Sequence, residues 1–264
     1  MDYMPHFRRE IVAFEAAVRR AADVGEALPV PSCPDWTVSD LVLHLGGVHR
    51  YVAAIVGNGL TAPPDVTDVT LFALPDDRAE WPTPDSAPTH GPVPPGLVDW
   101  FADGAGELAA LFESGDGDRT VWTWSQEQTV GFWLRMQTIE AALHRWDAES
   151  VTGPARPVAA ELATDAVSQV FEVMAPARRA WKQAPPGSGE RFGYRRTDGP
   201  GAWTVLFTGD DVRLTEAAAP CDVELAGTAS DLMLHLWHRI PADHLEVKGD
   251  QEVLDRYFTL VPPV

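Results

Sequence analysis

The sequence of 264 residues contains only two cysteines, Cys33 and Cys221, which lie far apart and lack any Cys-x-x-Cys spacing. This excludes a disulfide framework and a cysteine-rich zinc site, so any metal must be held by histidine and carboxylate side chains. No apolar run reaches the roughly 18 to 20 residues that a transmembrane helix requires. The N-terminal residues lack the apolar segment and cleavage site of a secretion signal. We therefore expect a cytoplasmic protein.

Positive charge is also scarce. The chain has 39 acidic and 20 basic residues, which give a formal net charge of -19 and an isoelectric point near 4.6. Such a surface repels phosphate backbones and anionic bilayers, so we expect neither a nucleic-acid partner nor a membrane partner. The composition, 45% hydrophobic and 22% charged, is that of a globular protein. The length allows two domains and leaves the oligomeric state open.

Apolar residues recur at helical spacing through the first two thirds of the chain. They predict helices over residues 3–24, 37–57, 96–113, 129–150 and 157–174. Thr37 and Asp40 have the spacing of an N-terminal cap for the second of these helices. Residues 61–95 are rich in proline, which predicts a long surface connection of the kind that often borders an active site.

The pattern of apolar and polar residues changes after residue 182. Residues 185–189 are linker-like, and the segments that follow alternate between apolar and polar side chains. Short strands are predicted over residues 203–207, 211–215, 222–225 and 244–248, and helices over 228–239 and 251–257. The sequence thus predicts an α+β protein with two domains. A helical bundle covers residues 1–182, and a small α/β domain covers residues 190–264.

Two helices of the predicted bundle direct ionisable side chains towards the interior. Glu140 and His144 lie one turn apart on the apolar face of the 129–150 helix. His44 lies in the apolar stripe of the 37–57 helix, whereas His49 is about 140° further around that helix and is the poorer candidate. A buried charge without a partner is costly, so we expect His44, Glu140 and His144 to need one another.

Two histidines and one glutamate form a ligand set suited to Zn²⁺ or another borderline divalent ion. Three protein ligands leave a fourth position for water or substrate, which is typical of a catalytic site, and bundle cores often hold metals in this way. The alternative is that His44 is an ordinary hydrogen-bonded histidine and that Glu140 and His144 form a helix-surface pair. Spacing alone does not decide between the two.

Three segments resemble one known family. Residues 30–45 (VPSCPDWTVSDLVLHL) strongly resemble the opening motif of the actinobacterial mycothiol-dependent maleylpyruvate isomerase family. Residues 140–149 (EAALHRWDAE) resemble its second metal-ligand helix, and residues 231–241 (DLMLHLWHRIP) resemble its C-terminal domain. The resemblance covers both predicted domains and essentially the whole chain. It implies that the N-terminal domain is a DinB-like four-helix bundle, which has up to five helices here.

The resemblance also implies a function. The metal ligands of the family fall on His44, Glu140 and His144, with zinc as the first choice of ion, and its substrate-holding arginine corresponds best to Arg239. Mycothiol would be the low-molecular-weight thiol, which adds to the double bond of an unsaturated keto acid before rotation and elimination. Addition without elimination would be an S-transferase reaction. We therefore expect a mycothiol-dependent isomerase or S-transferase acting on a small electrophile such as maleylpyruvate.

The chain departs from the family pattern near the ligand glutamate. Many members carry an arginine four residues before it and often a histidine immediately before it, whereas this chain has Met136 and Ile139, with Arg135 one place earlier. This puts the substrate in doubt more than the metal. Two alternatives remain: a non-catalytic metal- or small-molecule-binding protein, and a DinB-like enzyme that acts on another substrate without mycothiol.

Further polar residues near these motifs allow more than one interpretation. Asp147, three residues after His144, either accepts a hydrogen bond from that imidazole or is a charge near the helix end. We expect His235 and His238 to be surface histidines. Trp36 is expected in the core or in a pocket wall.

Overall fold

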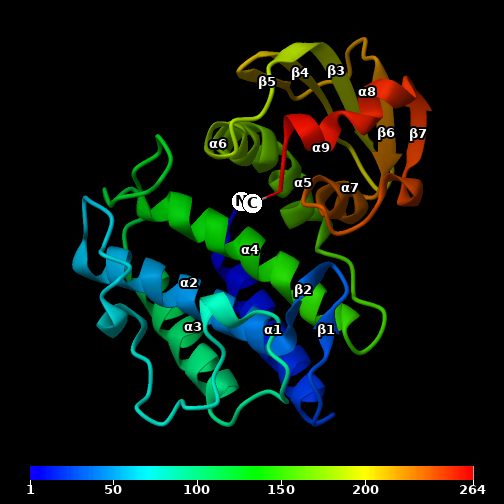
Figure 1. Ribbon diagram of the computed structural model, residues 1–264. Helices are drawn as coiled ribbons and strands as arrows, with labels where there is room; N and C mark the ends of the chain where they lie inside the picture. Colours follow the sequence, from blue (N-terminus) through cyan, green and yellow to red (C-terminus); the bar gives the residue numbers. More distant parts are fainter. Residues whose placement is uncertain (264) are drawn as a thin grey trace. The chain divides into compact units, whose positions relative to one another are not determined.

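The computed structural model describes residues 1–263, with Pro84 described by its backbone alone, and divides into two compact units. The first unit is Met1–Arg156, and the second begins at Pro157. The first is helical, whereas the second is built on a sheet with helices (Figure 1). This confirms the predicted fold class. In the described part of the chain, no helix is both long and apolar enough to span a bilayer.

Four long helices form the first unit. They are α1 (Met4–Ala22), α2 (Val38–Asn58), α3 (Leu97–Ser114) and α4 (Val130–Ser150). Helix α1 packs on α4 and α3, and α2 packs on α3 and α4, so the four enclose one apolar core. All four begin within two residues of their predicted starts because their apolar faces and caps are local signals. At α4, for example, Phe132 N donates to Thr129 Oγ1 at 3.0 Å.

A short hairpin that the sequence did not predict precedes α2. It pairs β1 (Pro29–Val30) with β2 (Cys33–Thr37). Its prolines indicated only a loop, but a two-stranded ribbon has outer edges where a residue without an N–H is tolerated. The hairpin matters because it carries Ser32 and Trp36 towards the interior faces of α2 and α4.

The start of α2 is fixed by Asp40. The backbone N and the Oγ1 of Thr37 each donate to Asp40 Oδ2 at 2.8 Å, which confirms the predicted cap. Thr89, in the proline-rich connection, donates its N to Asp40 Oδ2 at 3.0 Å and its Oγ1 to Asp40 Oδ1 at 2.6 Å. Asp40 therefore ties the long connection to the first turn of the helix.

We expect Asp40→Ala to lower the free energy of unfolding by about 1–2 kcal/mol at pH 7, because a helix cap is lost. Burial raises the pKa of Asp40, but the hydrogen bonds from Thr89 and Thr37 outweigh it and hold the pKa below the ordinary value of 3.8. A carboxyl with a lowered folded-state pKa stabilises the fold above its unfolded pKa, and this contribution is lost as the pH falls through the folded pKa.

Urea unfolding at several pH values would measure this effect. The stability difference between wild type and Asp40→Ala should be constant above about pH 5 and shrink below about pH 4. Asp76→Ala, at an exposed position of the same connection, should change stability by less than about 0.5 kcal/mol. A difference that stayed constant down to pH 3 would contradict this role for the Asp40 carboxylate.

The second unit contains a five-stranded sheet in the order β5-β4-β3-β6-β7. Strands β3 and β6 are parallel, and the other neighbours are antiparallel. The strands are β3 (Gly187–Arg196), β4 (Ala202–Gly209), β5 (Asp211–Thr215), β6 (Val223–Gly227) and β7 (Glu246–Gly249). The central strand β3 was not predicted. It begins in the glycine- and serine-rich segment that indicated a linker, and it contains exposed or half-exposed charged residues such as Arg191 and Arg195.

Helices cover this sheet. They are α5 (Ala160–Gln169), α6 (Ala175–Trp181), α7 (Ala229–Leu236), α8 (Gln251–Asp255) and α9 (Tyr257–Leu260). A π-helical turn, Val170–Met174, joins α5 to α6, so the helical segment continues beyond the predicted end at residue 174. Such a turn accommodates Pro176, which has no N–H for the helical ladder. Helix α7 is capped by Thr228, whose Oγ1 accepts a hydrogen bond from Asp231 N at 3.1 Å.

The units divide between Arg156 and Pro157, earlier than the predicted boundary at residues 182–190. The reason is that α5 packs on α7 and the segment that follows packs beside β5, so this helix belongs to the second unit instead of extending the bundle. An amphipathic stripe indicates that a helix has a buried face but not which core covers it.

The prediction that His235 and His238 are surface histidines was wrong. His235 is only 2% exposed, and its Nδ1 lies 3.2 Å from the Ile240 carbonyl oxygen. His238 is half-buried, with its ring centroid 4.1 Å from that of Phe258. It adopts a left-handed backbone conformation, φ 64°, just beyond the end of α7. Both rings pack against Phe258 in the C-terminal segment. This segment lies outside the 231–241 motif, so the motif alone did not indicate the burial.

Candidate functional site

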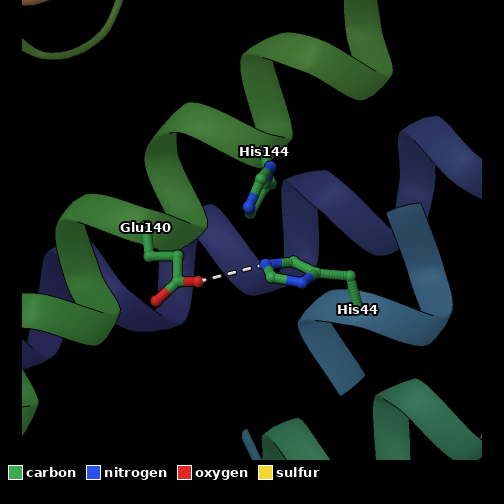
Figure 2. A group of neighbouring side chains, drawn as sticks. All are labelled: His44, Glu140 and His144. Atoms are coloured by element: carbon green, nitrogen blue, oxygen red, sulfur yellow. Dashed lines mark hydrogen bonds and ion pairs between the residues drawn. The ribbon is translucent and has the colours of Figure 1, made fainter. Parts of the chain in front are cut away.

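His44, Glu140 and His144 meet between α2 and α4. Each offers one ligand atom, and these atoms all lie within 4.8 Å of one another. His44 Nε2 and Glu140 Oε1 are 3.3 Å apart, and the two imidazole centroids are 5.0 Å apart. Figure 2 shows the two α4 side chains and the α2 histidine pointing towards a common centre. The side chains are 34%, 19% and 7% exposed, respectively, so the cluster is open on the His44 side.

Asp147 orients the deepest of these groups. Its Oδ2 is 2.9 Å from His144 Nδ1, and its side chain is fully buried. Because an ionised carboxylate only accepts hydrogen bonds, His144 Nδ1 carries the proton, and in the neutral imidazole Nε2 is then the nitrogen that can act as a ligand. Ser32 Oγ donates to the other Asp147 oxygen at 2.5 Å. Of the two roles considered for Asp147, the structure supports acceptance from His144.

Glu140 is held as a carboxylate. Burial raises the pKa of its carboxyl, but the hydrogen bond with His44 and the charges of His44 and His144 outweigh burial and lower the pKa to about 2. Gln137, one turn earlier on α4, donates its Nε2 to Glu140 Oε2 at 3.0 Å. One carboxylate oxygen is thus positioned by the amide, and the other faces His44.

These donors fit a divalent ion. Zinc binds histidine nitrogen and carboxylate oxygen at roughly 2.0–2.2 Å, so two donors of one tetrahedral ion lie roughly 3.3–3.6 Å apart. The separations here reach 4.8 Å at most, and small side-chain rotations would close the set. A glutamate and a histidine already oriented by Gln137 and Asp147 are typical of metal ligands held by outer hydrogen bonds.

His49 has a different position. It is fully buried, with its ring centroid 5.6 Å from that of Phe7 and 5.5 Å from that of Phe101. Burial lowers the pKa of His49 to about 3 and keeps it neutral. Within the described structure neither of its ring nitrogens has a hydrogen-bond partner. His49 is therefore part of the aromatic core and lies outside the three-ligand cluster, as its angle around the helix indicates.

A cavity of about 540 Å³ begins at His44. One wall is the half-buried face of α2 that carries His44 and Gly47, and the other is the proline-rich connection together with Trp100 of α3. The expectation that this connection borders a site agrees with the structure, and so does a wall position for Trp36, whose ring centroid is 4.8 Å from that of His44. The aromatic wall residues Phe72, Trp81 and Trp100 were not singled out, because no periodicity or motif in the sequence connects them.

The remaining residues of interest are not among the three candidate ligands. Met136 and Ile139, at the positions where many family members carry arginine and histidine, are buried apolar side chains of α4. Arg239 belongs to the second unit, where it follows α7 and donates its Nη1 to the Trp237 carbonyl oxygen at 2.8 Å. Its assignment as a substrate-binding residue stays a prediction.

Comparisons with known proteins cover both units. The model of the mycothiol maleylpyruvate isomerase N-terminal domain matches residues 7–149, and the MDMPI C-terminal domain model matches residues 161–256. A search of curated protein sequences finds no significant match. Among solved structures, crystal structures of the mycothiol-dependent maleylpyruvate isomerase, one a histidine-to-alanine mutant and one without that mutation, superpose with TM-scores of 0.62 and 0.60.

Each superposition has 13% sequence identity and covers 94% of this chain and 92% of the other, which shows a common fold. The first family model alone matches more than half of the chain, and the second follows it in the same order. The chain therefore belongs to the mycothiol maleylpyruvate isomerase family, a family of enzymes.

Proposed function

We propose that this protein is a metal- and mycothiol-dependent isomerase or S-transferase that acts on a small electrophile such as maleylpyruvate. The observation that carries the proposal is the convergence of ligand atoms of His44, Glu140 and His144 within 4.8 Å of one another, with His44 also lining a cavity. Family membership supplies the thiol and the class of substrate.

The three side chains would hold a divalent ion, with zinc as the first choice. When bound there, such an ion lowers the pKa of a thiol or water at its open position, and the thiolate is the nucleophilic form. Asp147 keeps His144 in the tautomer that presents Nε2, and Gln137 keeps Glu140 oriented. The indole of Trp36 lies beside His44, with the two ring centroids 4.8 Å apart.

Arg239 is the second part of the proposal. A guanidinium binds carboxylates through two parallel hydrogen bonds and stabilises a developing enolate charge. We assign it to the substrate carboxylate, and a kcat/KM loss of at least tenfold in Arg239→Lys would be the expected sign of that role. A cytoplasmic location completes the proposal, because neither cysteine is part of a disulfide and the cytoplasm keeps a thiol cofactor reduced.

The test is turnover of maleylpyruvate by zinc-loaded protein with mycothiol, followed by proton NMR. We expect conversion of the cis to the trans isomer only when zinc and mycothiol are both present. In isomerisation the thiol is regenerated. In S-transfer one thiol is consumed for each C–S bond formed, with its proton delivered to the neighbouring carbon. Turnover without mycothiol would indicate a different enzyme, and zinc-loaded protein inert towards both maleylpyruvate and mycothiol would favour the binding-protein alternative.

A further inference from the structure

The cavity next to His44 has an aromatic and aliphatic wall. Trp36, Phe72, Trp81 and Trp100 contribute rings, and Leu43, Val48, Val66, Val69 and Leu74 contribute aliphatic side chains. Gly46 makes this wall possible, because a Cβ there would lie 2.3 Å from the Trp100 ring. The volume of the cavity, about 540 Å³, lies within the range of small-molecule sites.

The polar groups in this wall are already paired. Trp81 Nε1 donates to the Pro95 carbonyl oxygen at 3.1 Å, and Trp100 Nε1 donates to the Phe72 carbonyl oxygen at 3.0 Å. Both carboxylate oxygens of Asp40 accept hydrogen bonds from Thr37 or Thr89. These groups therefore offer a ligand ring faces and methyl groups instead of hydrogen-bond donors.

Positive charge is almost absent from the cavity. Among the lining residues that the structure describes, Arg78 is the only arginine or lysine. It is exposed, and its Nη1 donates to the Pro75 carbonyl oxygen at 2.7 Å. The wall also includes the carboxylate of Asp40, which opposes a second negative charge. A carboxylate inside this cavity would lose its hydration without gaining a buried cationic partner.

We propose that the substrate carries an apolar arm, an alkyl chain or an aromatic ring, that occupies this cavity while its reactive double bond lies beside His44. The inference rests on the proposed function for the position of the reactive end. It narrows the proposed substrate class to electrophiles with a hydrophobic body and no charge at the far end. Maleylpyruvate, which carries a second carboxylate, should therefore be turned over less efficiently than such a compound.

The arm can be tested without any thiol chemistry. Saturated 2-alkanones of four, six and eight carbons do not undergo conjugate addition, and their binding to zinc-loaded protein is measurable by ligand-observed NMR titration. If the arm is buried, each added methylene should strengthen binding about threefold to fourfold. The charged counterparts 5-oxohexanoate and 7-oxooctanoate should bind at least tenfold more weakly than 2-hexanone and 2-octanone.

A matched pair of variants locates the binding. Gly47 lies on the cavity face of α2, and a Cβ there would be 3.9 Å from Phe72 Cδ1, so Gly47→Leu fills the cavity without a backbone clash. Gly106 on α3 is exposed, and a Cβ there meets nothing within 4 Å. We expect Gly47→Leu to weaken 2-octanone binding at least tenfold with zinc content unchanged, and Gly106→Leu to leave it as in wild type.

The outcomes separate this inference from the proposed function. Affinities that do not rise with chain length, tighter binding of the oxoalkanoates, or equal effects of the two leucine variants would overturn the apolar-arm proposal, whatever the activity with mycothiol. A graded series that is lost in Gly47→Leu would support it, even if the zinc-loaded protein proved inactive with mycothiol. In that case only the thiol-dependent reaction would be rejected.

Discussion

Replacing His44 or Glu140 by alanine is expected to abolish stoichiometric binding of a divalent ion, whereas the wild-type chain should bind close to one ion. The two residues come from different helices, and with His144 they form the one cluster of its kind in the part of the chain that the structure describes. A site reduced to two protein ligands no longer meets the three-ligand requirement of catalytic zinc sites. Elemental analysis of protein purified without chelators measures the ion content directly.

The control is a histidine outside the cluster. His90 lies exposed in the proline-rich connection, so His90→Ala should retain the full metal content of the wild type. Circular dichroism should show that both ligand variants keep their helices, because neither side chain belongs to the apolar core. Unchanged metal content in both His44→Ala and Glu140→Ala would eliminate the site.

The second large effect is expected at Arg145, one residue after His144 and therefore roughly 100° further around α4. Its Nε donates to Glu10 Oε2 at 2.8 Å, and its Nη1 donates to Glu149 Oε2 at 3.0 Å. All three side chains are at least 94% buried. Removing the cation leaves Glu10 with only the half-exposed Arg9 as a cationic partner and Glu149 with only the exposed Arg156. Arg145→Met should therefore lower the free energy of unfolding by about 3 kcal/mol, the lower end of the range for breaking a buried ion pair.

Urea denaturation of Arg145→Met and of Arg19→Met tests this expectation. Arg19 also bridges two carboxylates, Glu15 and Asp99, but its side chain is 48% exposed. Water screens such a pair, so Arg19→Met should cost about 1 kcal/mol or less. Equal losses in the two variants would show that burial does not set the strength of the Arg145 interactions. Replacing Glu10 as well should recover part of the loss, because a buried carboxylate whose remaining partner, Arg9, is half-exposed is removed.

The site illustrates how far local patterns reach. The helical period placed Glu140 and His144 on one face of α4 and His44 on the inner face of α2, because side-chain direction along a helix repeats every 3.6 residues. The same period separated His49 from that face. For Asp147 it allowed two roles, and only the packing of the β1–β2 hairpin, which brings Ser32 to its second oxygen, decided between them.

Contacts between distant segments were beyond the reach of these patterns. Nothing local indicated that the proline-rich connection returns over α2 and completes a cavity with Trp81 and Phe72, because its path depends on the hydrogen bonds of Thr89 to Asp40. The burial of His235 under the C-terminal segment is of the same kind. The central strand β3 was missed because one face of it is partly exposed and carries charged residues, which weaken the apolar pattern expected of a central strand.

The sequence by itself determined the helices of the bundle, the faces that carry the candidate metal ligands, the two-part fold class and the family. These properties follow from residue spacing, capping and motif order, which act over a few residues or are inherited as whole segments. Only the tertiary structure decided that α5 belongs to the second unit, that Asp147 orients His144, and that an apolar cavity begins at His44. Each of these depends on which side chains, distant in sequence, pack together to exclude water, and a one-dimensional pattern does not contain that information.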